Sequence, residues 1–215
     1  DNFYKKNWSA FEKKLGKEYP DIQPDKGRGR NQKQKDQILS DQIDGFFYPY
    51  ATIQNESLGS NPIDLTEYWK GKKLTEIQII NSMSKYIDPY LTWATKYYDV
   101  RQRINSSYSK DLRKAIISLK QMGVSKAMLH FLVRLLHEVN QGNITHNKAA
   151  ENIKLIEDHF VRRALATGDA AAAGTGMDGV FKGLWNETKG DLNKMRKAFI
   201  KGKKGIPGKE DFKDG

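Results

Sequence analysis

A stripe of large apolar side chains between residues 126 and 140 constrains the fold of this chain more than any other feature. Its members recur at i, i+1, i+4, i+7, i+8 and i+11, namely Met128, Leu129, Leu132, Leu135, Leu136 and Val139. This spacing places them on one broad side of an α-helix, as in a helix that packs against a core. Ser125 precedes the stripe and Gly142 follows it, and these residue types favour helix starts and ends.

The same apolar period recurs along most of the sequence, and no strand-like alternation persists. We therefore predict a mainly α, multi-helix orthogonal bundle with a basic, loop-rich N-terminal region. Pro49 is expected to interrupt the apolar stretch at residues 38–53, and Pro89 to kink or split the helix at 74–100. Asp64 and Glu67 have capping-box spacing and predict a short helix. Further helices are expected at residues 3–15, 109–122, 145–166, 177–188 and 191–201.

Three parts are expected along the chain: N-terminal helices at residues 1–70 with a basic loop at 24–36, a main bundle at 71–205, and a tail at 206–215. A chain of 215 residues can bury a core without metal or disulfide staples. It contains no cysteine, which excludes thiol catalysis and disulfides and fits a reducing compartment. The charged opening residues do not resemble a signal peptide, and no apolar run has the length of a membrane span. We expect a cytoplasmic protein.

Positive charge is the second constraint. The net charge is +11, and a surplus of this size attracts polyanions such as nucleic acids. The cations gather in three clusters, at residues 26–35, 101–114 and 189–204. Spaced in this way they would neutralise phosphates without reading bases, although each cluster alone also fits an ordinary solvated surface. The expected phosphate contacts in these clusters are Arg28, Arg30, Lys33, Lys35, Arg101, Arg103, Arg113, Lys194, Arg196, Lys197 and Lys201.

Arg162 and Arg163 stand out because they are adjacent on a helix with an apolar stripe. Neighbouring helical residues point about 100° apart, so one arginine can face the core boundary and the other the solvent. The planar guanidinium suits phosphate or carboxylate. Both residues are therefore candidates for phosphate binding, and the alternative is a structural salt bridge to Glu157, Asp158 or another helix.

No catalytic or metal motif in the sequence is complete. His130 and His137 lie two turns apart on one helix with Glu138 nearby, but a His-Glu-x-x-His motif is missing, so surface or hydrogen-bonded histidines are the preferred interpretation over a zinc site. Residues 174–179 match Gly-x-Gly-x-x-Gly in letters, yet no strand precedes them and no Walker lysine follows. The free amides of a helix beginning at Met177 could still hold a phosphate. We predict no catalytic residues, metal or cofactor in this chain.

Five segments together resemble a known family. Residues 156–165, which read Ile-Glu-Asp-His-Phe-Val-Arg-Arg-Ala-Leu, are similar to an IE-x-x-x-V-R-R-A motif in the helical half of the N-terminal domain of GmrSD-type restriction proteins, which also occurs in SspE-like defence proteins. Residues 177–184 and 206–212 resemble the elements that follow it in that family, written lnkiFxxL and fPxdeeF. Residues 8–12 and 44–50 resemble its upstream W-x-x-fE and dF-x-x-yL elements.

The resemblance implies a helical module of a modification-dependent restriction or anti-phage defence protein, with DNA as partner. The family's Asp-Gly-Gln-Arg motif and its His-Asn-His nuclease half are both missing from this sequence. The chain is therefore expected to be part of a larger protein, in which ParB-like and nuclease segments or other subunits would bind nucleoside triphosphate and cut DNA. Two alternatives remain, a structural protein–protein interaction module without nucleic-acid contact, and a stand-alone enzyme built from dispersed histidines and carboxylates.

Overall fold

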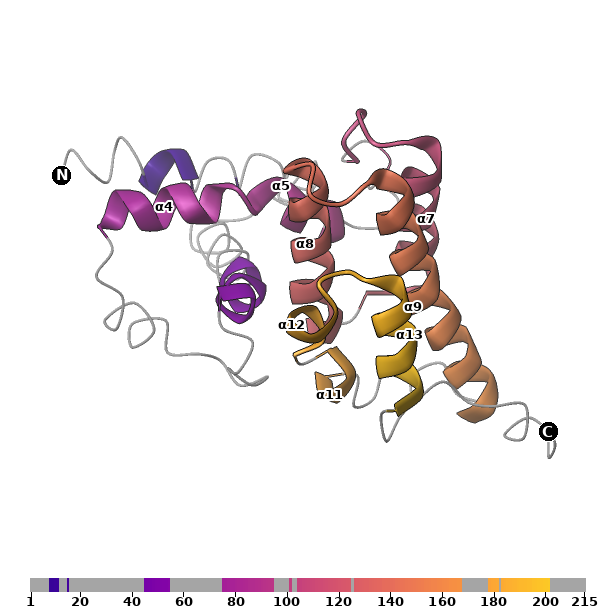
Figure 1. Ribbon diagram of the computed structural model, residues 1–215. Coiled ribbons are helices and arrows are strands. Elements are labelled where there is room, and N and C mark those ends of the chain that lie inside the picture. The colour runs from indigo at the N-terminus through magenta and orange to yellow at the C-terminus, as the bar shows by residue number, and fades with distance from the viewer. Residues whose placement is uncertain are drawn as a thin grey trace, which may run out of the picture.

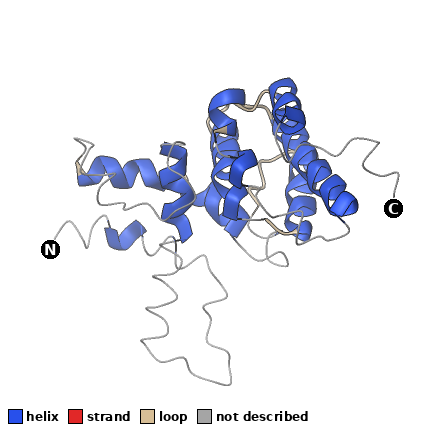
Figure 2. Ribbon diagram, turned by 90° about the horizontal axis from the view of Figure 1, so that it is seen from below, coloured by secondary structure: helices blue, strands red, loops and turns tan. Residues whose placement is uncertain are grey.

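The computed structural model describes residues 8–11, 15, 45–54, 75–94, 101, 104–124, 126–167, 178–181 and 183–201. Most of these residues are helical and none is in a strand (Figure 2), which confirms the predicted mainly α fold. Within this part of the chain, no helix has the length and apolarity that crossing a membrane requires. The expected helix around Asp64 and Glu67 lies outside the described residues.

The N-terminal helices are joined by aromatic contacts. Residues 8–11 and 15 are helical, and a second helical segment covers 45–54. Phe46 meets Phe11 edge to face at 5.5 Å between ring centroids and stacks on Tyr50 at 5.7 Å. The prediction that Pro49 interrupts this segment is wrong, because the backbone stays helical through it. Phe46 and Tyr50 lie one turn apart and are each 1% exposed, and their burial offsets the roughly 3 kcal/mol cost of a helical proline.

The long stretch from residue 74 is split into two helices, as predicted. Helix α4 (Glu76–Ser84) begins with a capping box between Thr75 and Gln78, and α5 (Ile87–Ala94) follows after one turn. The split comes before Pro89 rather than at it. Pro89 is the third residue of α5, where a backbone N–H has no intrahelical partner and its loss costs little.

The central helices follow the predicted boundaries closely. Helix α7 (Lys110–Met122) is capped by Ser109, whose hydroxyl accepts a hydrogen bond from the Leu112 amide, and it ends at Gly123 with φ 93°. Helix α8 (Lys126–Asn140) buries five of the six predicted stripe residues, and Leu129 packs partly buried against the same core. Helix α9 (His146–Thr167) packs along α7, while α5 packs against α8 (Figure 1).

The C-terminal part departs from the prediction. The single helix expected at residues 177–188 is two short ones, α11 (Asp178–Phe181) and α12 (Leu184–Thr188). Gly183 lies between them with φ 74°, a left-handed conformation that ends the first helix and redirects the chain. Helix α13 (Leu192–Lys201) follows as predicted and packs on α9 and α12. Phe181 of α11 and Trp185 of α12 both contact Phe131 of α8 edge to face.

Candidate nucleic-acid interface

Helix α13 carries the clearest cationic surface among the described residues. The Asp191 carboxylate caps its first turn by accepting a hydrogen bond from the Lys194 amide at 2.9 Å. Met195 and Phe199, at most 1% exposed, fix one side of the helix to the core. Lys194, Arg196 and Lys197 project from the other side into solvent, and we call them the α13 cationic face. No carboxylate lies between residues 192 and 201 to offset them.

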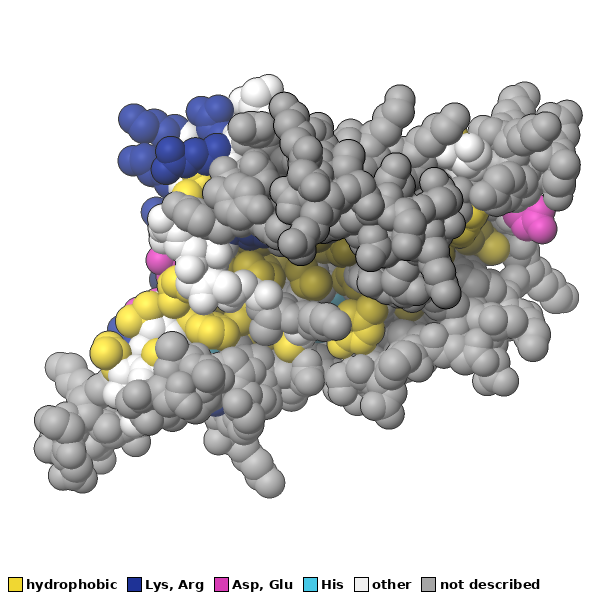
Figure 3. Space-filling model, turned by 180° about the vertical axis from the view of Figure 1, so that it is seen from behind, with side chains coloured by type: hydrophobic (Ala, Val, Ile, Leu, Met, Phe, Trp, Pro, Cys, Tyr) yellow, Lys and Arg dark blue, Asp and Glu magenta, His cyan; other side chains and the backbone are white. Residues whose placement is uncertain are grey.

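A second cationic surface lies on the first two turns of α7. Lys110, Arg113 and Lys114 are exposed and stand opposite the buried side formed by Leu112, Ile116 and neighbours. We call these three cations the α7 cationic face. Figure 3, seen from behind, shows Lys and Arg side chains gathered at the end of the molecule where α7 begins. Asp111 is the only acidic residue of this helix.

Helix α9 separates the two faces. On one side it meets α7, where the Ser118 hydroxyl donates to the Glu157 carboxylate at 2.6 Å. On another side the His159 ring stacks on Phe199 of α13. Each residue of an α-helix rotates the side-chain direction by about 100°, so two residues rotate it by about 200°. The smaller angle between the directions of Glu157 and His159 is therefore about 160°. The α7 and α13 contacts thus leave α9 in nearly opposite directions, and each cationic face lies on the side of its own helix that is opposite its buried residues.

The two adjacent arginines face different environments, as their spacing predicts. Arg162 is exposed and its Nε lies 2.9 Å from Asp158, the i,i+4 ion pair named as the structural alternative. Arg163 is 8% exposed, and burial lowers the pKa of its guanidinium. An exposed pair of this kind contributes about 0–1 kcal/mol, so it does not prevent Arg162 from contacting phosphate. Arg163 is thus a buried residue and not part of the cationic surface.

Lys120 shows that not every cation of α7 reaches the surface. It lies two residues before the end of α7 and is half-buried, and its ammonium donates a hydrogen bond to the Trp93 carbonyl of α5. Burial lowers the pKa of this amine to about 8. Lys120 therefore ties α7 to α5 and is not part of the α7 cationic face.

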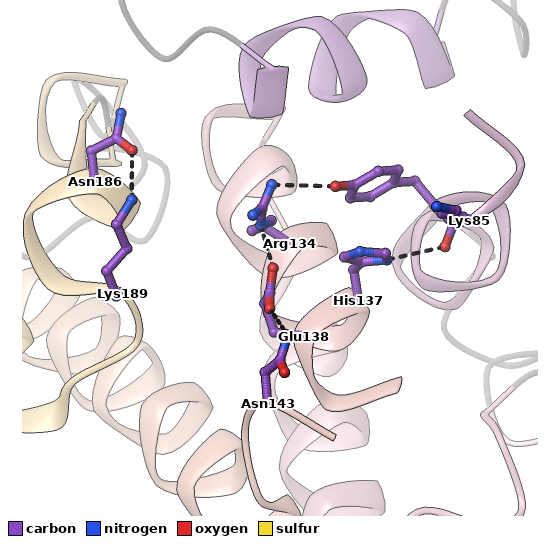
Figure 4. A network of polar contacts seen from close by, with 8 residues as sticks. Lys85, Arg134, His137, Glu138, Asn143, Asn186 and Lys189 are labelled. Atoms are coloured by element: carbon purple, nitrogen blue, oxygen red, sulfur yellow. Dashed lines mark hydrogen bonds and ion pairs between the residues drawn. The ribbon is translucent and has the colours of Figure 1, made fainter. Parts of the chain in front are cut away.

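His130 and His137 are both buried and bind backbone carbonyls of different elements. The His130 Nε2 lies 3.1 Å from the Phe181 carbonyl of α11. The His137 Nδ1 lies 3.3 Å from the Lys85 carbonyl, between α4 and α5 (Figure 4). Within the described part of the chain no three His, Asp or Glu side chains cluster as metal ligands do. These histidines are interhelical ties, in agreement with the preferred interpretation.

Arg134 is the centre of a polar network that joins three parts of the bundle (Figure 4). Its NH1 group donates to the Tyr86 hydroxyl at 3.2 Å, and its guanidinium lies 5.7 Å from the Trp185 ring centroid. Its Nε lies 2.7 Å from Glu138, but the N–H is not aimed at the oxygen, so the contact is an ion pair rather than a directed hydrogen bond. Burial raises the pKa of Tyr86, which stays a neutral acceptor.

The remaining sequence candidates fall into three groups. Arg101 is exposed and thus accessible to a phosphate. Arg28, Arg30, Lys33, Lys35 and Arg103, together with the side chain of Lys201, lie outside the described residues. The phosphate site suggested at the helix after Met177 has little support, because α11 is a four-residue helix that presents few free amides.

Asn152 and His159 were not singled out from the sequence, yet both are fully buried between α9 and the C-terminal helices. Asn152 donates to the Gly190 carbonyl at 2.9 Å, and His159 stacks on Phe199. In the sequence, the available signal was a polar residue at an inward position of the α9 apolar stripe. That signal does not identify the residue that the buried side chain contacts.

Comparisons of the chain with models of known protein families, with characterised proteins and with solved structures find no match.

Proposed function

We propose that this chain is a helical module of a defence or restriction protein that contacts DNA through backbone phosphates. The supporting observation is the α13 cationic face, on which Lys194, Arg196 and Lys197 are exposed on a helix anchored by Met195 and Phe199. Cations on a fixed helical scaffold bind a polyanion with less loss of conformational freedom than cations on a loose segment. The α7 cationic face and Arg162 would add further contacts.

The assignment to a defence or restriction protein rests on the resemblance of residues 156–165 to the GmrSD-type motif. In this proposal Arg162 reaches phosphate while Arg163, which is buried, does not. Nucleotide binding and DNA cleavage would reside in other segments or subunits. The proposed contacts are to phosphates, so we expect affinity without sequence preference.

Duplex affinity measured against salt concentration tests this function. Binding through phosphates predicts a straight log–log plot that falls steeply with salt, with a slope of about −0.9 per neutralised phosphate. Lys194→Glu/Lys197→Glu should abolish binding at the α13 cationic face and so lower the amount of duplex bound per chain. Lys85→Glu/Lys154→Glu is a matched control, because both lysines are exposed, lie outside the two cationic faces and change the net charge equally. No binding at low salt would refute the proposal.

A protein-interaction module without nucleic-acid contact is the second candidate, and one observation favours it. Val161 and Leu165 lie one turn apart near the end of α9 and are 40% and 68% exposed. An apolar pair of this kind on a helix is suited to a partner helix. Val161→Ser/Leu165→Ser should then abolish assembly with a partner while duplex binding is unchanged. If those changes leave assembly intact, this candidate fails.

A further inference from the structure

The two cationic faces cannot both lie against one short, straight duplex. Glu157 and His159 define the directions from α9 to α7 and α13, and these differ by about 160°. Packed helix axes lie about 8–10 Å apart, so the axes of α7 and α13 are on the order of 16–20 Å apart, with α9 between them. The cations are exposed and stand opposite the buried residues of α7 and α13.

Bending DNA around these three helices would be costly. A duplex is stiff over about 150 base pairs, so bending a segment of only about 20–30 base pairs by about 40–90° is unfavourable. Reaching both faces would need nearly a half-turn around a layer only a few helices thick. A duplex on one face therefore leaves the other free for a second segment.

Both faces are built in the same way, which supports equal use. Each has three exposed cations on a capped helix, namely Lys110, Arg113 and Lys114 on α7 and Lys194, Arg196 and Lys197 on α13. Each stands opposite a buried apolar side, so the cations are held at the surface. Salt bridges among the described residues involve none of these six side chains.

We infer that the chain binds two separate duplex segments, one on the α7 cationic face and one on the α13 cationic face, and so bridges DNA. This inference rests on the proposed DNA contact. It adds that the two faces are independent sites, each of which binds the phosphates of its own duplex. Loss of one face therefore halves the number of duplexes bound, while loss of both abolishes binding.

The test uses duplexes of about 20 base pairs, or two turns of B-DNA, at low salt. One duplex is fixed to beads, and capture of a second, fluorescent duplex by the chain is measured alongside the binding of a single duplex in solution. The wild-type chain should capture the second duplex and bind two duplexes per chain. Arg113→Glu/Lys114→Glu and Lys194→Glu/Lys197→Glu should each keep single-duplex binding, with one duplex per chain, and lose capture. The four-fold variant should lose both, and Lys85→Glu/Lys154→Glu should lose neither.

The outcomes separate the two proposals. Absence of all duplex binding refutes the proposed function itself. Single-duplex binding without capture, at one duplex per chain, overturns the bridging inference and leaves the function intact. Capture that survives in either two-residue variant also overturns it, because bridging would then come from association of chains through one face. Circular dichroism of each variant checks that the helices are retained.

Discussion

The imidazole of His159 lies nearly flat against the ring of Phe199, with ring centroids 4.8 Å apart and ring planes inclined by 14°. This contact joins α9 to α13 and so positions the α13 cationic face. His159 is fully buried, and in the described part of the chain neither of its ring nitrogens has a hydrogen-bond partner. The packing of α9 against α13 at this contact therefore depends on a neutral imidazole.

Because His159 is buried as a neutral ring, we expect the folded chain to lose stability in acid. Burial, with a contribution from Arg163, lowers the pKa of His159 from 6.5 to about 4. Above pH 6.5 the ring is neutral in both the folded and the unfolded chain; as the pH falls from 6.5 towards 4, only the unfolded chain gains the proton. Since each pKa unit corresponds to about 1.4 kcal/mol, the loss in the free energy of unfolding is on the order of 3 kcal/mol at full extent.

His159→Phe separates this effect from the titration of carboxylates. A phenyl ring keeps the stack on Phe199 and cannot be protonated. Urea unfolding at pH 7 and pH 5 should show a smaller drop in stability for the variant than for the wild-type chain. The variant should be at least as stable at pH 7, because no polar ring atom is buried. An equal drop in both proteins would contradict the prediction.

Asn152 should be a strong tie between α9 and the α12–α13 turn. Its side-chain amide donates to the Gly190 carbonyl at 2.9 Å and to the Lys148 carbonyl at 3.0 Å. Asn152→Ala leaves the buried Gly190 carbonyl without this donor, which costs about 1–3 kcal/mol. Asn147→Ala, at an exposed position of the same helix, should change stability by less than about 0.5 kcal/mol. Thermal and urea unfolding measure both, and equal effects would count against the tie.

Gly190 and Gly142 offer a matched pair of glycine substitutions. Both have positive φ, at 70° and 75°, so alanine is strained at each by about 1–2 kcal/mol. A Cβ on Gly190 would also lie 2.9 Å from Ile144 Cδ1, whereas one on Gly142 meets nothing within 4 Å. Gly190→Ala should therefore lower the melting temperature more than Gly142→Ala. The reverse order would mean that the core near Ile144 adjusts freely.

Arg162 and Arg163 should give opposite results when replaced by alanine. Arg163 is 8% exposed, so its loss removes buried packing and should cost more than about 1 kcal/mol of stability. Arg162 is exposed and paired only with Asp158 in the described chain, so its loss should change stability by less than about 1 kcal/mol. If Arg162 contacts phosphate, its replacement should instead weaken duplex binding. Urea unfolding and duplex titration of both variants separate the two roles.

Local structure was predictable where neighbouring residues decide it. The α8 stripe, the Ser109 cap, the Gly123 end of α7 and the start of α13 at Asp191 all follow from side chains within one or two turns. The same rules were wrong at Pro49 and at residues 177–188. There the outcome depends on aromatic packing with distant partners and on the left-handed conformation of Gly183.

The candidate surface divides in the same way. The sequence alone determined that cations cluster at residues 101–114 and 189–204, and that two adjacent helical arginines can face different environments. Only the tertiary structure decided that Arg163 is the buried one, that Lys120 is drawn inward to Trp93, and that the α7 and α13 contacts leave α9 in nearly opposite directions. The physical reason is range: caps and periodicity act between near neighbours in the chain, whereas burial and the direction of a face depend on contacts between residues dozens of positions apart.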